Sequence, residues 1–345
     1  IFDEPTAVLT PQEIDELMAI MKSLAREGKS ILFITHKLME IKAVADRCTV
    51  LRKGALVGTV EVAQTDVETM AEMMVGRKVN FSIDKAEAVP GEAVLEVKHL
   101  SVAGHHKKPA VNDVSFQVRK GEIVCIAGID GNGQSELIYA LSGLLPVKSG
   151  QILLKGRDVT QDSIRARNTD GLSHIPEDRH KYGLVLDFSL EQNLALKNYF
   201  VPPMEHHGFI DFPAVRRQAE TLIERFDIRS GQGAETRARS MSGGNQQKAI
   251  IAREIHSNPD LLLAVQPTRG LDVGATIYIH EQLVKARDEG KAILLVSLEL
   301  DEVFQLADRI LVIYEGRIVA ELSGRDTTAQ ELGLYMAGSR KEATA

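Results

Sequence analysis

Residues 123–136 read IVCIAGIDGNGQSE, an apolar run followed by a turn with three glycines. The first five residues predict a fully buried strand, and the glycines predict a tight connection to the helix that follows. A helix that starts directly after such a turn presents backbone N–H groups to an anion. The spacing fits the phosphate-loop pattern Gly-x4-Gly-Lys-Ser/Thr, with Gln134 in place of the lysine and Ser135 as the hydroxyl for Mg²⁺. A turn that binds no ligand is the alternative.

The chain also repeats part of itself at an offset of 262 residues. The matching segments are 3–6 with 265–268, 27–29 with 289–291, and 45–47 with 307–309. Three reactive side chains of the first copy change in the second, where Asp3, Glu4 and His36 become Val265, Gln266 and Leu298. We therefore expect the end of one working nucleotide-binding domain and the whole of one altered copy. A helix-capping turn at Asp3-Glu4 and a surface His36 are the alternatives.

Composition sets ordinary limits. The 345 residues fit one complete domain and part of a second. The net charge of −7 argues against a protein that binds nucleic acid by neutralising phosphates. Cys48 and Cys125 show no metal-ligand spacing, and two isolated thiols fit a reducing cytosol. No apolar run reaches the ~18–20 residues that crossing a bilayer requires. Because the chain begins inside an apolar run without Met, we expect a C-terminal fragment of a longer protein.

Strand and helix patterns alternate along the chain, which predicts an α/β fold. We expect a helix from Thr10, as its N-cap, to Gly28, and a fully buried parallel strand over 30–35. The further expected elements are a helix over 37–45 and strands over 49–51, 55–60, 94–102, 114–118 and 123–127. The predicted domains are the C-terminal part of a first domain at 1–83, a linker at 84–93, a complete second domain at 94–340 with a helical insertion at about 160–250, and a tail at 341–345.

The most specific string is Ser240-Met241-Ser242-Gly243-Gly244-Asn245-Gln246-Gln247-Lys248. A serine and two glycines at a helix start offer a hydroxyl, close backbone approach and aligned N–H dipoles to a γ-phosphate. A serine-capped helix is the alternative. The apolar and charged run over 250–255, followed by Pro259-Asp260 and three leucines, makes a chance match improbable.

These motifs together resemble the ATP-binding subunit of an ABC transporter, of the tandem type that serves importers of simple sugars and nucleosides. The resemblance runs from residue 1 to about 338. Its matching segments are Asp3-Glu4 with the Walker B strand end, His36 with the switch histidine, 175–179 with the coupling loop, 242–246 with the signature, and 265–275 with the second Walker B region and its following loop. Glu177 stands where Gln is usual. The spelling Ala-Val-Gln-Pro at 264–267 resembles the nucleoside branch more than the ribose or galactose branch.

The resemblance implies a P-loop NTPase fold of the ABC ATPase type, with a central mixed, mostly parallel sheet, helices on both faces and an inserted helical subdomain. Two such domains would face head to tail, and each ATP would lie between the phosphate loop of one and the signature of the other. In the first site, Glu4 would polarise the attacking water, His36 would contact the γ-phosphate, and Asp3 would hold Mg²⁺ through water. The signature residues there would be Ser242, Gly243, Gly244 and Asn245.

The second site would use the phosphate loop of the altered copy, with these nucleotide-binding residues: Gly128, Gly131, Gly133, Gln134, Ser135 and Glu136. Ser135 would also be its metal ligand, and Glu177 and Asp272 would couple the site to partner subunits. Electrostatic stabilisation supplies nearly all of phosphoryl-transfer catalysis, so losing the lysine, both carboxylates and the histidine removes most of it. We therefore expect this site to hold nucleotide but barely to hydrolyse it.

The function implied is that of an energy-coupling ATPase subunit, peripheral at the cytoplasmic face of the cell membrane, with ATP and Mg²⁺ as cofactors. Its partners would be transmembrane permease subunits and, through them, an extracytoplasmic solute-binding protein, with no nucleic acid. Nucleosides are the expected cargo, and ribose- or galactose-type sugars are the alternative. A soluble tandem ABC protein acting on ribosomes or DNA, and a nucleotide-free regulatory module, are less favoured. We expect the chain alone to be inactive and to expose apolar surface over 1–80.

Overall fold

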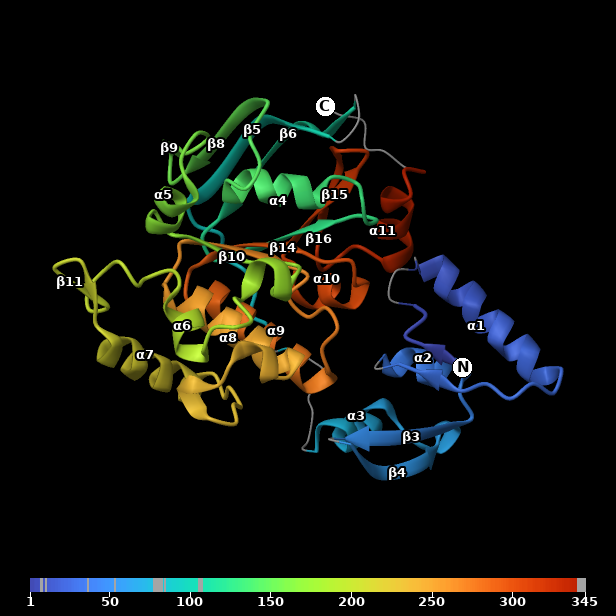
Figure 1. Cartoon of the computed structure of the whole chain (residues 1–345). Helices are drawn as coiled ribbons and strands as arrows, with labels where there is room; N and C mark the ends of the chain where they lie inside the picture. The colour runs from blue at the N-terminus through green and yellow to red at the C-terminus, as the bar shows by residue number, and fades with distance from the viewer. Residues whose placement is uncertain are drawn as a thin grey trace. The chain divides into compact units, whose positions relative to one another are not determined.

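The computed structural model describes residues 1–6, 9, 11–35, 37–52, 54–76, 83, 85–104 and 108–339, without the side chains of residues 11 and 12. The chain divides into two units, one of Ile1–Asp84 with Leu271–Tyr278 and one of Lys85–Gly270 with Ile279–Ala345 (Figure 1). Each unit is described by itself. The predicted linker 84–93 lies at this division; residues 85–92 form no helix or strand, whereas Ala93 already belongs to strand β5 (Ala93–Ala103). The predicted domain limits themselves remain a prediction.

A six-stranded sheet forms the centre of the second unit, with the order β10-β13-β14-β7-β15-β16. Its strands are β10 (Leu172–Ile175), β13 (Leu261–Val265), β14 (Ala292–Val296), β7 (Ile123–Ala127), β15 (Arg309–Tyr314) and β16 (Arg317–Ser323). Every neighbouring pair is parallel except β15 with β16, which is antiparallel. Every residue of β7, β13 and β14 is buried, as expected for a parallel sheet covered on both faces. The predicted mixed, mostly parallel sheet is confirmed.

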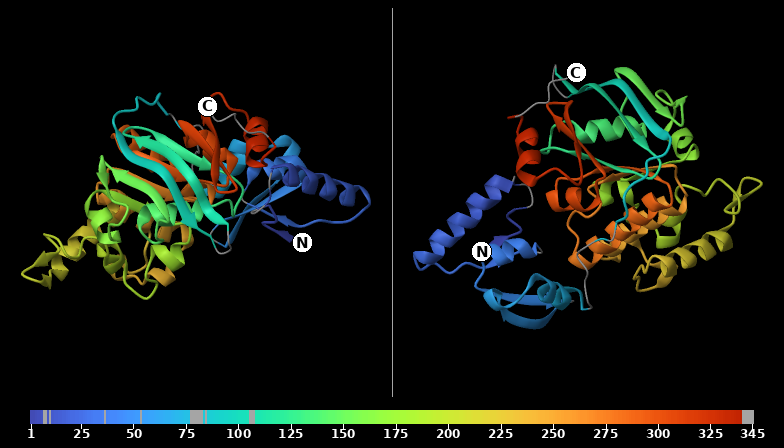
Figure 2. Two further views of the ribbon diagram at one scale, coloured as in Figure 1. Left: turned by 90° about the horizontal axis from the view of Figure 1, so that it is seen from above. Right: turned by 180° about the vertical axis from the view of Figure 1, so that it is seen from behind.

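A second, antiparallel sheet covers one side of this core. It has the order β6-β5-β8-β9, with β6 (Pro109–Arg119), β5 (Ala93–Ala103), β8 (Ser149–Leu154) and β9 (Arg157–Asp158). Helix α4 (Gln134–Ser142) lies between the two sheets, and Leu137, Ile138 and Leu141 join one continuous apolar core with both of them. Figures 1 and 2 show α4 on one face of the six-stranded sheet and α8 (Gly243–His256) on the other.

The predicted helical insertion is only partly helical. Its helical elements are α5 (Ile164–Thr169), a π-helical turn at Arg179–Gly183, α6 (Leu190–Ala195), α7 (Phe212–Arg225), short turns at Gly233–Glu235 and Ala238–Ser240, and α8. Strand β10 lies within the predicted limits but belongs to the central sheet, because its four residues pair in parallel with β13. A small hairpin of β11 (Glu205–His206) and β12 (Phe209–Ile210) also interrupts the helices. The unit is completed by α9 (Val273–Asp288), which starts in the first unit, α10 (Leu300–Leu306) and α11 (Ala329–Met336).

The first unit contains β1 (Phe2–Asp3), α1 (Pro11–Arg26), β2 (Phe33–Ile34), α2 (Leu38–Val44), β3 (Arg47–Arg52), β4 (Ala55–Glu61), a turn at Val62–Gln64 and α3 (Val67–Val75). Gly28, at a φ of 84°, ends α1 by donating its N–H to the carbonyl of Ala25 at 2.9 Å. The predicted N-cap Thr10 lies outside the described residues. A small core forms from Leu38, Ile41, Val62, Met70 and Ala71.

The fully buried strand predicted over 30–35 is wrong. Only Phe33 and Ile34 form a strand, and Leu32 and Ile34 are 58% and 48% exposed. Among the described strands, β2 pairs only with β1, whereas its counterpart β14 lies between β13 and β7. A parallel strand is buried only when neighbours cover it on both sides and both faces. The first unit therefore leaves apolar surface uncovered, as expected for residues 1–80.

The sequence repeat extends to the backbone. At the offset of 262 residues, α1 matches α9, α2 matches α10, β3 matches β15, β4 matches β16, and α3 starts where α11 does. Gly54 and Gly316, at matching positions, have φ values of 76° and 75°. Both hairpins also shift register at the matching step, Val50/Leu51 in one and Val312/Ile313 in the other.

Among the helices that the structure describes, none has both the length and the apolar composition to cross a membrane.

Candidate functional site

The glycine-rich loop connects β7 to α4, as the sequence predicts. Gly133 is the N-cap of α4 with a φ of 103°, and Gly131 has a φ of 85°, values that favour glycine. A Cβ on Gly128 would lie 2.6 Å from the carbonyl oxygen of Ile313, and one on Gly133 would collide with the carbonyl of Ala110. Side chains at these positions would therefore push the loop away from its neighbours. The result is a bare backbone turn at the start of a helix, suited to phosphate.

The amide of Gln134 is used inside this loop. Its side chain is 5% exposed, and its Nε2 donates to the carbonyl of Ile129 at 3.0 Å. Asn132 Nδ2 donates to the same carbonyl at 3.0 Å, and its Oδ1 accepts from the N–H of Glu315 at 2.8 Å. The two amides therefore brace the loop. Because Gln134 carries no charge, the loop lacks the charge-assisted contact to phosphate that a lysine would supply.

Ser135 and Glu177 come together although they are 42 residues apart. The Ser135 hydroxyl donates to the Glu177 carboxylate, at 3.4 Å from Oε1 and 3.3 Å from Oε2, and the Tyr139 hydroxyl donates to Oε1 at 2.8 Å. Burial raises the pKa of Tyr139, and its hydrogen bond to Glu177 raises it further, so the phenol stays protonated. A carboxylate is thus held beside the hydroxyl of the phosphate loop.

These residues line a cavity of about 590 Å³. Its lining is Ala103, Gly104, Ser135, Glu136, Tyr139, Leu144, Leu145, Glu177, Lys181 and Tyr182. The structure therefore brings the predicted residues Ser135, Glu136 and Glu177 to one site. A hydroxyl and a carboxylate are the hard oxygen donors that Mg²⁺ prefers, so these residues fit the metal. Val265, at the end of β13, offers no such donor.

The signature residues form the start of α8. Ser242 is the N-cap, but its side chain makes no capping hydrogen bond to the helix backbone. Its Oγ instead accepts from Asn245 Nδ2 at 2.9 Å, and Asn245 Oδ1 accepts from the N–H of Arg229 at 2.7 Å. Gly243 and Gly244 open the first turn of the helix. This differs from a serine-capped helix, because Asn245 holds the hydroxyl in place without engaging the N–H groups of the first turn.

The remaining predicted residues lie in the first unit. Asp3 ends β1, and Glu4 follows it with a φ of 43°, while its N–H donates to the carbonyl of Ile34 at 2.9 Å. The carboxylate of Asp272 accepts from the N–H of Ala275 at 2.9 Å and so caps the first turn of α9. His36 lies outside the described residues.

Two buried networks of polar and charged side chains were not found from the sequence. Glu254 on α8 is fully buried, and it pairs with Lys197 at 2.5 Å and with Arg253 at 2.9 Å. Glu302 on α10 accepts from Thr268 at 2.8 Å and pairs with buried His280 at 2.9 Å. The sequence indicates such networks only by charged residues within apolar helical stretches. It does not show which residues they pair with.

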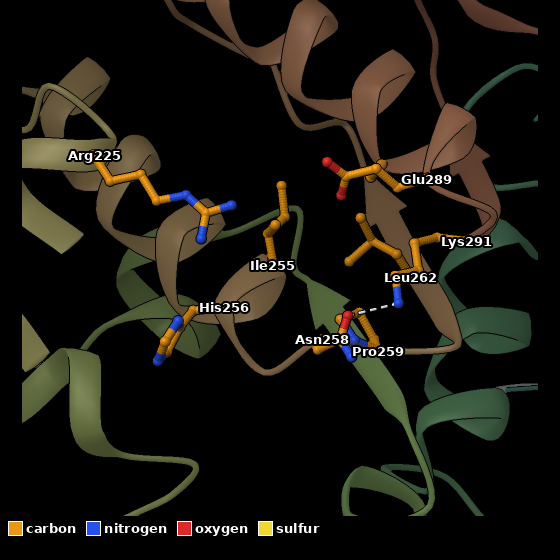
Figure 3. Close-up of a pocket in the computed structure, with 9 residues that line it drawn as sticks. Arg225, Ile255, His256, Asn258, Pro259, Leu262, Glu289 and Lys291 are labelled. Atoms are coloured by element: carbon orange, nitrogen blue, oxygen red, sulfur yellow. Dashed lines mark hydrogen bonds between the residues drawn. The ribbon is translucent and has the colours of Figure 1, made fainter. Parts of the chain in front are cut away.

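A second cavity, of about 260 Å³, lies at the amino ends of the central strands β13 and β14 (Figure 3). It is lined by residues before the amino ends of β13 and β14, including Asn258 and Lys291, and by Arg225 at the end of α7. Lys291 Nζ donates to Asn258 Oδ1 at 2.6 Å. The phosphate loop follows the carboxyl end of β7, so this cavity is separate from the candidate site.

A phosphate loop between a buried strand and a helix, with a serine-led helix start on the other face of the sheet, defines a nucleotide-binding ATPase domain. The ABC transporter family model matches residues 111–269. A solved structure of an ATP-binding subunit of an ABC transporter superposes with a TM-score of 0.58 at 24% identity, covering 71% of this chain and 99% of that one. That likeness supports the same fold.

Among curated proteins, the nucleoside import ATP-binding protein NupA of Lactococcus lactis subsp. cremoris is 54% identical over 338 residues, 98% of this chain and 67% of that protein. The guanosine import ATP-binding protein NupO of Bacillus subtilis is 52% identical over 344 residues, 99% of this chain and 67% of that protein. The glucose import ATP-binding protein TsgD13 of Haloferax volcanii is 45% identical over 339 residues, 98% and 62% of the two chains. This chain belongs to the ABC transporter family, as an energy-coupling ATPase of an importer. It spans about two thirds of the length of these relatives.

Proposed function

We propose that this chain energises the import of nucleosides through partner permeases. The observation that carries the proposal is the sequence identity of this chain to its relatives. Those named for nucleoside and guanosine import are 54% and 52% identical to it, and the one named for glucose import is 45% identical. The spelling Ala-Val-Gln-Pro at 264–267 supports the same branch. Ribose- or galactose-type sugars are the alternative cargo.

We further propose that the chain is the C-terminal part of a tandem protein with two unlike ATP sites. Matching backbone positions in the two copies carry Asp3 and Glu4 in one and Val265 and Gln266 in the other, which supports the asymmetry. In the competent site, Asp3 would hold Mg²⁺, Glu4 would polarise the attacking water, and His36 would contact the γ-phosphate. The start of α8, from Ser242 to Asn245, would face that same phosphate.

The degenerate site would be the loop Gly128–Ser135 with Glu136 and Glu177. Bound Mg²⁺ would neutralise phosphate charge there, and Ser135 and Glu177 would hold it. With Gln134 braced inside the loop and Val265 apolar, this site keeps the shape of a phosphate cradle but few of its charges. Nucleotide would therefore bind weakly and turn over slowly.

The partners proposed are transmembrane permease subunits and, through them, an extracytoplasmic solute-binding protein, with the ATPase peripheral at the cytoplasmic face of the membrane. Glu177 and Asp272 would transmit the nucleotide state to the permeases. Glu177 suits this role because its loop begins at the phosphate site and runs on into the helical region.

The test is uptake by the full-length protein assembled with its permeases and solute-binding protein in proteoliposomes. With ATP inside, labelled guanosine and adenosine should accumulate, and excess unlabelled ribose should not compete. Accumulation of ribose with no nucleoside uptake would replace the proposed cargo by the sugar alternative. Co-purification with ribosomes and absence of permease binding would instead remove the importer from the proposal altogether.

A further inference from the structure

The cavity of about 260 Å³ at the amino ends of β13 and β14 lies away from the nucleotide chemistry. Strands β13, β14 and β7 run parallel, and the phosphate loop follows the carboxyl end of β7, so the cavity lies at the other end of these strands. All of its lining belongs to the second unit. Its volume is just below the range of about 300–1,000 Å³ that is usual for small-molecule sites, so a small metabolite fits.

The floor of this cavity is apolar. Leu262 and Ala286 are buried, with exposed fractions of 1% and 5%, and Pro259 is buried beside them. Ile255, in the last turn of α8, is partly buried and belongs to the same lining. A ligand with an apolar part that covers these residues would remove apolar surface from water, which favours binding.

Two opposite charges face each other across this floor. Arg225 is the last residue of α7, and Glu289 follows the end of α9. Figure 3 shows the guanidinium and the carboxylate on opposite sides of the cavity and directed toward each other, with Ile255 and Leu262 between them. Within the described part of the chain, neither side chain makes a hydrogen bond or an ion pair. Both groups are therefore available to a ligand.

The other polar side chains of the lining offer a ligand less. Lys291 Nζ donates to Asn258 Oδ1 at 2.6 Å, so this ammonium group already has a partner. Partial burial lowers the pKa of His256, and the charge of Arg225 lowers it further, so the ring is largely neutral at pH 7. Among the described lining residues, the charges left without a partner are one guanidinium and one carboxylate.

This pair of charges selects a ligand that carries both signs. A guanidinium binds a carboxylate through two parallel hydrogen bonds, and a carboxylate accepts from an ammonium group. Helices α7, α8 and α9 all end at the cavity, and the partial negative charge of helix C-termini also favours an ammonium group. A ligand with an anionic group alone would be repelled by Glu289, and one with a cationic group alone would be repelled by Arg225.

We propose that this cavity binds a zwitterionic aliphatic amino acid, with its carboxylate on Arg225 and its ammonium group on Glu289. The aliphatic part would cover the apolar floor. Such a site would make this ATPase a receptor for a second metabolite besides ATP, at a place where the two do not compete. The proposal does not depend on which cargo is imported.

Titration of the 345-residue chain followed by NMR tests this site, with L-leucine and its isomer ε-aminocaproate as probes. Leucine carries its two charges on one carbon and ε-aminocaproate carries them at opposite ends, so the comparison reports the spacing that the cavity accepts. At least one isomer should cause saturable shifts of amides 255–258 and 289–291. The acids without the ammonium group (isocaproate, caproate) and the amines without the carboxylate (isopentylamine, pentylamine) should bind at least about tenfold more weakly, the usual effect of losing a charge-assisted hydrogen bond.

Two variants assign the charges. Arg225→Gln and Glu289→Gln each remove one charge with little change of size, and each should weaken binding of the preferred isomer by about tenfold. Arg217→Gln on α7 and Glu281→Gln on α9 are the matched controls, because they remove the same charges at exposed positions of the same helices outside the cavity lining. Both controls should bind as the wild type does. Unchanged amide spectra away from the cavity show that each variant is folded.

The proposal is overturned if neither isomer causes saturable shifts, or if the acid or the amine binds as tightly as the amino acid. It is also overturned if Arg225→Gln and Glu289→Gln leave the affinity unchanged. Binding that persists with saturating AMP-PNP and Mg²⁺ supports a site separate from the phosphate loop, whereas binding that the nucleotide abolishes would place the amino acid at that loop and contradict the proposal.

Discussion

Glu4 and Gln266 adopt the same left-handed backbone conformation, with a φ of 43° at each, although they lie 262 residues apart. The N–H of Glu4 donates to Ile34 at 2.9 Å, and that of Gln266 donates to the matching residue Val296 at 2.7 Å. A positive φ is uncommon outside glycine and persists only where the surrounding structure fixes it. The two copies therefore present their side chains from the same turn, and the exchange of carboxylate for amide is a change of chemistry at a fixed position.

The first prediction follows from that exchange. Glu4→Gln, which keeps the shape of the side chain, should lower ATP turnover of the full-length protein with its permeases by about 10²–10⁴-fold, the usual contribution of a general base. Nucleotide affinity should persist. Steady-state phosphate release and a nucleotide-binding titration measure the two quantities.

The reverse change should have no such effect. Gln266→Glu restores one carboxylate. The second carboxylate, the histidine and the lysine are still missing, because Val265, Leu298 and Gln134 stand at their positions. Turnover should therefore stay at the wild-type level. In the double variant with Glu4→Gln, activity should remain as low as in Glu4→Gln alone. Recovery of turnover in that double variant would show that one carboxylate is enough for hydrolysis at the site of Gln266. It would contradict the proposal that this site is degenerate.

The phosphate loop offers a second prediction. Gln134→Lys should tighten binding of Mg-ATP to the loop Gly128–Ser135 by about tenfold, because a charged donor adds a charge-assisted hydrogen bond to phosphate. The new ammonium group can keep the contact to the Ile129 carbonyl while the loop is empty. Calorimetric titration of the 345-residue chain measures the affinity.

Gln134→Met is the control for this prediction. It matches the length of the glutamine without its amide, so it should loosen the loop and weaken binding. If the lysine variant bound no more tightly than the wild type, the missing cation would not be the cause of a weak site.

Much of the fold was predictable because local pattern and burial agree. The apolar run at 123–127 lies in a sheet with neighbours on both sides, and the structure buries all of it. The run at 30–35 has the same pattern, yet Ile34 is 48% exposed. An apolar run indicates that a strand is suited to burial. Whether the strand is buried also depends on the strands beside it. The sequence of residues 30–35 says nothing about those neighbours.

The candidate site divides in the same way. Gly128, Gly133 and Ser135 were predictable because a phosphate loop is continuous in sequence, and its conformation follows from glycine and a helix start. The hydrogen bonds of Glu177 to Ser135 and Tyr139 join residues some 40 positions apart and come from the pairing of β10 beside β13. Tyr139 had no sequence signal, because an aromatic residue on an apolar helix normally indicates core.

Buried Glu254 carries the third prediction. Burial alone would raise its pKa, but the charges of Lys197 and Arg253 outweigh that effect, and the pKa is lowered. Glu254→Ala should lower the free energy of unfolding by about 3–5 kcal/mol, because it leaves two partly or fully buried cations uncompensated. Urea unfolding monitored by circular dichroism measures the loss. Glu220→Ala, at an exposed position on α7, should change it little, and an equal loss in both variants would contradict the network's role.

His174, the third of the four residues of β10, lies next to that network and carries the last prediction. Burial lowers its pKa to about 4; the charge of Glu254 favours protonation, whereas those of Lys197 and Arg253 oppose it. The unfolded chain, with an ordinary histidine pKa near 6.5, therefore binds a proton between about pH 6.5 and pH 4 that the folded chain does not. This contribution to stability is complete above pH 6.5 and is lost as the pH falls toward 4.

Between pH 7 and pH 5, the wild type should thus lose about 1–2 kcal/mol more than His174→Gln, which cannot titrate. The difference between the two proteins matters, because carboxylates elsewhere titrate equally in both. Urea unfolding at the two pH values measures it, with His206→Gln, at an exposed position in β11, as the control that should behave as the wild type does. If the two histidine variants lost stability equally on acidification, the proton uptake would belong to another group. His174 would then not be the cause of this pH dependence of stability.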